Sequence, residues 1–128
     1  MIRYYNIVKD KLKCPVCGTW GKRHSKATRR IRDLGTPTEK GWLEVTTSKH
    51  YCPTCDKYFR NYHRNLYAPL ARYTNRAVSV AISFVVDRGY SFEEAQDLLR
   101  EKYSLFIPTS SIHDWIKREG YRLESKNE

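Results

Sequence analysis

Four cysteines in two CPxC turns are the residues of this chain with the clearest chemistry: Cys14, Cys17, Cys52 and Cys55. A CxxC turn directs both sulfurs at one point about 2.3 Å from a Zn²⁺ ion, and two turns supply the four thiolates of a closed tetrahedral site. Such a site keeps no coordination position for a substrate. Gly18 and Asp56 directly follow the turns, where the backbone favours positive φ. The spacing therefore predicts one structural zinc site.

Three other uses of the cysteine pairs are a redox motif, two disulfides and a tetrathiolate iron site. A thioredoxin-like motif occurs once and beside a βαβ pattern, and disulfides belong to oxidising compartments, whereas no apolar signal segment precedes Cys14. Zinc is favoured on these grounds, and iron stays open as the alternative metal. His50 lies two residues before Cys52 and could replace a thiolate, but with four sulfurs available we expect a solvated histidine on a strand.

The excess of positive charge lies in the first half of the chain. Residues 1–66 contain 15 Lys and Arg against 5 Asp and Glu, whereas residues 67–128 contain 9 of each. A zinc ion on four thiolates would reduce the excess from +10 to about +8. Such a one-sided excess predicts a nucleic-acid footprint, although a solvated basic face without a partner has the same composition. The residues of this half expected to contact DNA are Lys22, Arg23, Lys26, Arg29, Arg30 and Arg32.

The first half also shows the period-two pattern of β-strands. Residues 28–34 alternate around Ile31, and residues 42–52 place apolar side chains on one face. Residues 57–62 can return as a further strand after the second cysteine turn. These patterns predict a small antiparallel zinc ribbon that carries its basic residues on a rigid surface. A region this small and polar needs the metal, because it cannot form a sizeable core unaided.

The second half changes to helical spacing. Residues 74–89 begin at Thr74, a typical N-cap, and the next segment begins with Ser91 and Glu94, which match a capping box. A third segment follows Pro108, with Thr109 as its expected N-cap. The pattern predicts three short helices, and the last two form the parts of a helix-turn-helix module.

The third predicted helix has two distinct faces. Ile112, Trp115 and Ile116 share an apolar face, and the opposite face is polar at its start and basic further along. A helix of this kind fits a DNA major groove, although Asp114 on the same face is unfavourable near phosphates. The outward residues expected to contact DNA are Ser110, Ser111, His113, Lys117 and Arg118.

The segments CPVCG, RRIRDLG, HYCPTCDKYF and SSIHDWIK, in this order, resemble the N-terminal part of the ISL-three family of insertion-sequence transposases. The resemblance covers roughly residues 12–120. It implies a zinc ribbon followed by a helix-turn-helix, with both parts engaging the terminal inverted repeats of the element. It also implies that the four cysteines bind zinc and that residues 110–119 read the DNA. The acidic DDE catalytic domain of that family would lie downstream, beyond Glu128.

Together these observations predict an α+β fold with a zinc ribbon over residues 1–66 and a trihelical helix-turn-helix domain over residues 67–128. The expected function is double-stranded DNA binding within a transposase-like protein, and the alternative is an adaptor that docks on a protein machine or on RNA. We expect no catalysis, because the acids of the second half repeat along one helix face. We also expect a cytoplasmic, nucleoid-associated protein without membrane or small-molecule partners, and a homodimer stays open.

Overall fold

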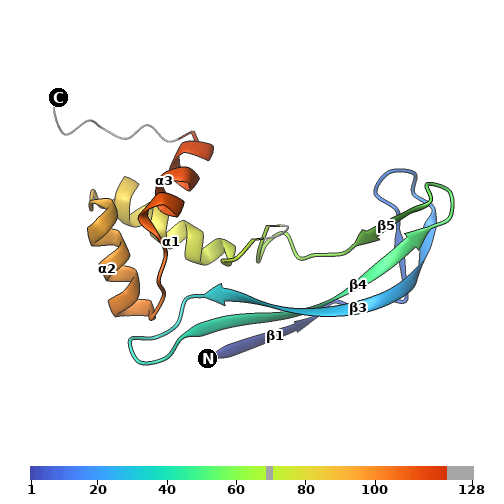
Figure 1. Ribbon diagram of the computed structural model, residues 1–128, viewed down its shortest axis with the longest axis horizontal. Coiled ribbons are helices and arrows are strands. Elements are labelled where there is room, and N and C mark those ends of the chain that lie inside the picture. Colours follow the sequence, from blue (N-terminus) through green and yellow to red (C-terminus); the bar gives the residue numbers. More distant parts are fainter. Residues whose placement is uncertain (69–70, 121–128) are drawn as a thin grey trace.

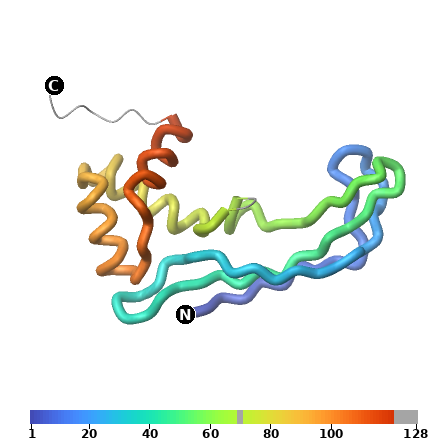
Figure 2. Tube along the Cα trace, in the orientation of Figure 1, coloured from blue at the N-terminus to red at the C-terminus, as the bar shows by residue number. Residues whose placement is uncertain are grey.

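The computed structural model of the chain describes residues 1–68 and 71–120, and it is an α+β structure as predicted. A long, curled five-stranded sheet leads into three helices, which lie at one end of the sheet (Figures 1 and 2). The elements are β1 (Ile2–Asn6), β2 (Lys11–Lys13), β3 (Trp20–Asp33), β4 (Gly41–Cys52), β5 (Lys57–Arg60), α1 (Asn75–Val86), α2 (Phe92–Tyr103) and α3 (Thr109–Arg118).

The sheet is mixed, which corrects the expectation of an antiparallel ribbon. The long strands β3 and β4 pair antiparallel, as do β2 with β3 and β5 with β4. However, β1 pairs parallel to β4, from Ile2 beside Trp42 to Asn6 beside Thr46. β1 and β5 occupy successive stretches of the same edge of β4, because β3 covers its other edge. The N-terminal segment was not assigned to a strand from its sequence, so this parallel pairing was missed.

The core of the sheet is small and lies on one of its faces. The alternation predicted for residues 42–52, which placed Leu43, Val45, Thr47 and Tyr51 on the covered face, is confirmed only as far as Thr47. Beyond it Ser48, His50 and Cys52 are buried and Tyr51 is half-buried. Leu43 and Val45 belong to the apolar cluster of the sheet. Ile31 from β3 and Tyr67, which follows the last strand, complete this cluster. The predicted domain boundary after residue 66 stays a prediction, and Tyr67 packs with the sheet.

Asp33, at the end of β3, joins the sheet to the helices. Its side chain is 1% exposed and accepts hydrogen bonds from Thr74 Oγ1 at 2.7 Å, Arg76 at 2.7 and 2.8 Å and Arg3 Nη2 at 2.9 Å. Nearby, the Gly35 amide donates to the Tyr103 carbonyl at 2.9 Å. A Cβ atom at Gly35 would lie 2.8 Å from that same oxygen, so only glycine permits the approach. The three helices are therefore fixed to the hairpin end of the sheet.

Two of the three expected helix caps are confirmed. Thr74 accepts a hydrogen bond from the Ala77 amide, and Ser91 with Glu94 forms a reciprocal capping box. The expectation for α3 is wrong, because Pro108 is its N-cap and no side chain within residues 1–68 and 71–120 caps the helix. The Ser111 and Ile112 amides both donate to the Pro108 carbonyl, at 3.0 and 3.3 Å. Thr109 therefore already lies inside the first turn.

The helices pack around one apolar core, separate from that of the sheet. Its buried residues are Ala77, Ala81, Ile82, Phe84, Ala95, Leu99, Leu105, Ile107, Ile112 and Ile116. The inward face predicted for α3 is confirmed, with Trp115 partly buried beside that core and its ring 5.5 Å from that of Tyr73. None of the helices within residues 1–68 and 71–120 is long and apolar enough to cross a membrane.

Candidate metal centre and basic strand

The four cysteines converge at the end of the sheet that is far from the helices. Cys14 and Cys17 precede β3, Cys52 ends β4, and Cys55 lies in the turn before β5. The Cys17 and Cys52 sulfurs are 3.4 Å apart, those of Cys14 and Cys55 are 4.0 Å apart, and all four lie within 4.8 Å of one another. Because β3 and β4 pair along their length, the sheet brings together two cysteine turns that are distant in sequence.

The two cysteine turns have the local geometry of metal-binding knuckles. Gly18 and Asp56 adopt φ angles of 77° and 52°, which confirms the expected positive φ after each turn. The Val16 amide lies 3.4 Å from Cys14 Sγ, and the Cys55 amide lies 3.4 Å from Cys52 Sγ. Amides directed at sulfur stabilise the thiolate form, which is the form that binds a metal.

Cys14, Cys17 and Cys55 differ in the direction in which their surroundings shift the pKa of the thiol. Cys17 Sγ and the Thr19 hydroxyl are hydrogen-bonded at 3.2 Å, and this contact together with the Thr19 amide lowers the pKa of Cys17 to about 6. Backbone hydrogen bonds in the first turn also lower the pKa of Cys14. The neighbouring Cys17 sulfur, followed by burial, raises the pKa of Cys55 to about 12. Four thiolates this close repel one another, so full ionisation requires a cation among them.

The cluster has the size of a four-sulfur metal site. A metal–sulfur distance of about 2.3 Å places neighbouring sulfurs of a tetrahedron about 3.8 Å apart. The observed separations of 3.4 and 4.0 Å lie on either side of that value. The four side chains could therefore hold one metal ion with little movement, and the donor set favours a metal with affinity for thiolates.

His50 is buried, which corrects the expectation of a solvated histidine. It is 0% exposed, and its ring stacks on Phe59 with the centroids 5.6 Å apart. Its Nε2 lies 2.7 Å from Ser48 Oγ, and its Nδ1 lies 3.3 Å from the Gly21 carbonyl oxygen. Both ring nitrogens thus have partners within the sheet. The period-two pattern indicated the strand but not which of its faces is covered.

The basic residues predicted to contact DNA lie mostly on β3. Six of the fourteen residues of this strand are basic, and its one acid, Asp33, is buried. Lys22, Arg23, Lys26, Arg29 and Arg30 are exposed, and Arg32 is partly buried. Between residues 23 and 31 no strand from the described part of the chain covers the outer edge of β3.

The sheet divides these basic residues between two faces. Cross-strand partners share a face, so Arg30 lies with Glu44 and Arg32 with Trp42, whereas Arg29 lies with the buried Val45. By the same register, which shifts between Arg23 and Ser25, one face carries Arg23, Lys26, Arg30 and Arg32, and the other carries Lys22 and Arg29. The sequence alone suggested a single surface, because its densest charge is continuous along the chain.

Several of these arginines have partners within the protein. Arg30 Nε lies 3.0 Å from Glu44 Oε1, and the Arg32 guanidinium stacks 4.9 Å from the centroid of the Trp42 ring. Arg23 pairs with the exposed Asp10 at 3.2 Å. The Arg29 guanidinium donates to the Ala71 carbonyl. The exposed ion pairs of Arg23 and Arg30 are weak and exchange readily for a phosphate partner.

The predicted outer face of α3 is largely exposed. Ser110, His113, Lys117 and Arg118 are exposed, and Ser111 is intermediate. The ring of His113 contacts that of Phe92 edge to face, with centroids 5.5 Å apart, and its Nδ1 lies 4.0 Å from the Asp114 carboxylate. Helix α3 lies at the opposite end of the molecule from β5 (Figure 1), and the cysteines lie near β5, at the start of β3 and the end of β4.

No protein-family model, no curated protein and no solved structure matches this chain.

Proposed function

We propose that this chain binds duplex DNA as the recognition module of a transposase-like protein, with one structural zinc ion in the cysteine cluster. The observation that carries the proposal is β3, a strand with six basic residues whose single acid is buried. Its alternative role is purely structural, because charged residues on an edge strand also prevent strands of other molecules from pairing there. Affinity for DNA and its salt dependence separate the two roles.

The basic face of β3 matches the length of a short DNA site. From Arg23 to Arg32 the strand spans about 30 Å at about 3.3 Å per residue, which equals about nine base pairs of duplex at about 3.4 Å each. Because β1 and β5 also pair with β4, the sheet is wider than a two-stranded ribbon, and β3 would meet the duplex along its phosphate backbone. Contacts of this type position the protein and carry little sequence information.

In this proposal, zinc in the cysteine cluster holds β3 in place. A closed four-thiolate site leaves no open coordination position, so its role is structural and not catalytic. Metal binding would fix the start of β3 to the end of β4. Sequence reading is assigned to α3, whose outer residues extend from Ser110 to Arg118, as the second helix of a helix-turn-helix. No catalytic role is assigned to any of these residues.

The test measures duplex binding by fluorescence anisotropy at several salt concentrations. Lys26→Gln with Arg30→Gln removes two charges from one face, so the slope of log affinity against log salt should fall by about 1.8. The control pair, Arg88→Gln with Lys102→Gln, removes two exposed charges from the helical end and should leave the slope unchanged. An affinity that does not vary with salt in the wild-type chain would refute the proposal.

A protein-docking adaptor is the second candidate, because apolar side chains are exposed near the cysteine cluster. Val16, Trp20 and Tyr58 are 80%, 58% and 51% exposed. Aromatic residues of this kind are enriched at interfaces and also stack on unpaired bases. Competition of duplex DNA, single-stranded DNA and RNA for one labelled probe separates the candidates, since a docking adaptor would prefer none of the three.

A further inference from the structure

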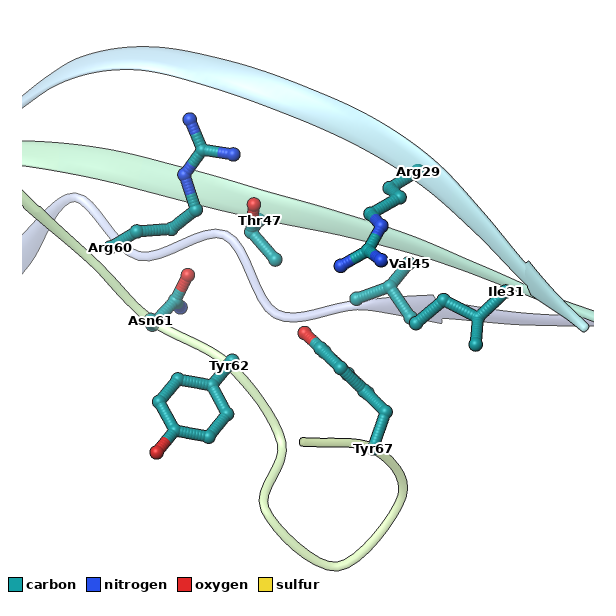
Figure 3. A pocket seen from close by; sticks show the side chains of 8 residues that line it. All are labelled: Arg29, Ile31, Val45, Thr47, Arg60, Asn61, Tyr62 and Tyr67. Atoms are coloured by element: carbon teal, nitrogen blue, oxygen red, sulfur yellow. The ribbon is translucent and has the colours of Figure 1, made fainter. Parts of the chain in front are cut away.

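A pocket of about 560 Å³ lies on the face of the sheet that carries Arg29, between the sheet and the segment after β5. Its lining residues are Arg29, Ile31, Val45, Thr47, Arg60, Asn61, Tyr62 and Tyr67 (Figure 3). None of the eight is acidic. The motifs of the sequence gave no sign of this pocket, because its residues come from four separate segments.

The pocket contains an unsatisfied donor. Tyr67 is 4% exposed, and among the residues that the structure describes its hydroxyl has no hydrogen-bond partner. Figure 3 shows this hydroxyl directed toward the space between Arg29 and Asn61. Burial raises the pKa of Tyr67, so the hydroxyl stays protonated and offers a hydrogen. A buried donor without a partner is costly, and a bound acceptor would remove that cost.

The charges of the pocket favour an anion. Arg29 is anchored by its hydrogen bond to the Ala71 carbonyl, and none of the ion pairs found within residues 1–68 and 71–120 uses Arg60. The two guanidinium groups lie on one side of the pocket, and the rings of Tyr62 and Tyr67 lie on the other (Figure 3). Guanidinium groups bind phosphate by paired, charge-assisted hydrogen bonds.

The size and the apolar wall of the pocket exclude a simple inorganic anion as its best ligand. Pockets of about 300 to 1,000 Å³ hold small organic molecules, so a phosphate ion alone would leave most of the space empty. Ile31, Val45 and the two tyrosine rings offer apolar and aromatic surface for a flat group. A phosphate joined to an aromatic base satisfies both parts of the pocket.

We infer that this pocket binds a single nucleotide unit, with the phosphate on Arg29, Arg60 and the Tyr67 hydroxyl and the base against the apolar wall. The unit is either a free mononucleotide or an unpaired nucleotide at the end of a DNA strand. The inference does not depend on duplex binding by the opposite face of the sheet. Of the six basic residues of β3 only Arg29 lines the pocket, whereas the face proposed for the duplex carries Arg23, Lys26, Arg30 and Arg32.

The experiment is an NMR titration of the ¹⁵N-labelled, zinc-loaded chain with deoxyadenosine monophosphate, deoxyadenosine and inorganic phosphate. Deoxyadenosine monophosphate should bind about tenfold or more tightly than deoxyadenosine or inorganic phosphate, because its phosphate and base contacts are joined in one molecule. Tyr67→Phe should weaken binding about 3- to 10-fold, and Arg60→Gln about 10-fold. Arg88→Gln, an exposed arginine at the helical end, is the matched control and should change nothing.

A second measurement identifies the source of the nucleotide. If a duplex with a one-nucleotide overhang binds more tightly than the blunt duplex, and Tyr67→Phe removes the difference, the ligand is the end of a DNA strand. If monophosphate binds and the overhang adds nothing, the ligand is a free nucleotide.

Two results would overturn the inference. One is equal affinity for phosphate and monophosphate, and the other is monophosphate binding that is unchanged in both Tyr67→Phe and Arg60→Gln. Failure of blunt-duplex binding with monophosphate binding retained would refute the proposed DNA function and leave the pocket assignment intact.

Discussion

Replacing Asp33 with asparagine should weaken the attachment of the helices to the sheet. The carboxylate is 1% exposed and receives hydrogen bonds from Arg3, Arg76 and Thr74. Removing one member of a buried ion pair costs about 3 to 5 kcal/mol. Here the Arg3 and Arg76 side chains are 35% and 46% exposed, so water partly hydrates them in the variant. We therefore expect a loss of about 2 to 3 kcal/mol in the free energy of unfolding.

The pH dependence of stability gives a second measure of how much the Asp33 carboxylate contributes to the free energy of unfolding. Burial acts to raise the pKa of Asp33, but hydrogen bonds from Arg76, Thr74, the Leu34 amide and Arg3 outweigh it and lower the pKa from 3.8 to about 2. Because the folded pKa lies below the unfolded one, the stabilisation is present above pH 4 and is lost as the pH falls toward 2. The shift corresponds to about 2 kcal/mol, in agreement with the estimate from the contacts.

The assay is urea denaturation of wild type and Asp33→Asn between pH 7 and pH 2, followed by the helical circular dichroism signal. Acid also protonates the cysteines, which would release a metal ion held by them in either protein, so the informative quantity is the difference in unfolding free energy between the two proteins. This difference should be constant above pH 5 and should decrease from pH 4 to pH 2. Asp10→Asn, which removes a carboxylate that is 92% exposed in its pair with Arg23, is the control and should cost less than about 0.5 kcal/mol. Equal losses in the two variants, or a difference that does not change with pH, would refute the reasoning.

Three further predictions concern the metal and the helices. The purified chain should contain one zinc ion, as metal analysis will show, and a chain without bound metal would contradict the site. Cys52→Ser should release the zinc and unfold the cysteine end of the sheet, while the amide NMR signals of the helices persist. Trp115→Ala should lower the free energy of unfolding by about 2 to 3 kcal/mol, less than the about 3 to 5 kcal/mol of a fully buried aromatic, because the Trp115 ring is only partly buried. Lys117→Ala and His113→Ala should leave stability unchanged and lower the affinity for a cognate duplex by about 1 to 3 kcal/mol, and footprints with unchanged affinity would remove α3 as the reading helix.

The sequence predicted the parts of the fold that local chemistry determines. The capping box at Ser91 and Glu94, the N-cap at Thr74 and the positive φ at Gly18 and Asp56 each depend on a few neighbouring residues, and all are confirmed. The convergence of the cysteines was predicted for a similar reason, because each CxxC pair prefers one turn geometry. The predicted N-cap of α3 was wrong, because contacts with another helix position the segment before it. The Gln96 side chain donates to the Ile107 carbonyl at 2.9 Å and holds the segment that leads into Pro108.

Features that depend on long-range pairing could not be predicted. The parallel pairing of β1 with β4 joins residues about 40 positions apart, and nothing in the sequence IRYYN indicates a partner. The burial of His50 and Asp33 depends on which strand face is covered, and a period of two does not specify this. The pocket around Tyr67 was missed because it forms only when the chain after β5 folds back over Ile31 and Val45.

The long β3–β4 pair is held at its two ends by different chemistry. At one end the cysteine cluster gathers the start of β3 and the end of β4, and at the other Asp33 fixes the hairpin end to Thr74 and Arg76 of the helical part. Loss of a metal ion from the cluster would therefore act on the cysteine end, whereas protonation of Asp33 acts on the attachment of the helices. Fixing both ends would keep the basic face of β3 and the outer face of α3 in one relative orientation. DNA binding that needs both faces should thus require both ends, whereas nucleotide binding at Tyr67 should survive the loss of α3 contacts.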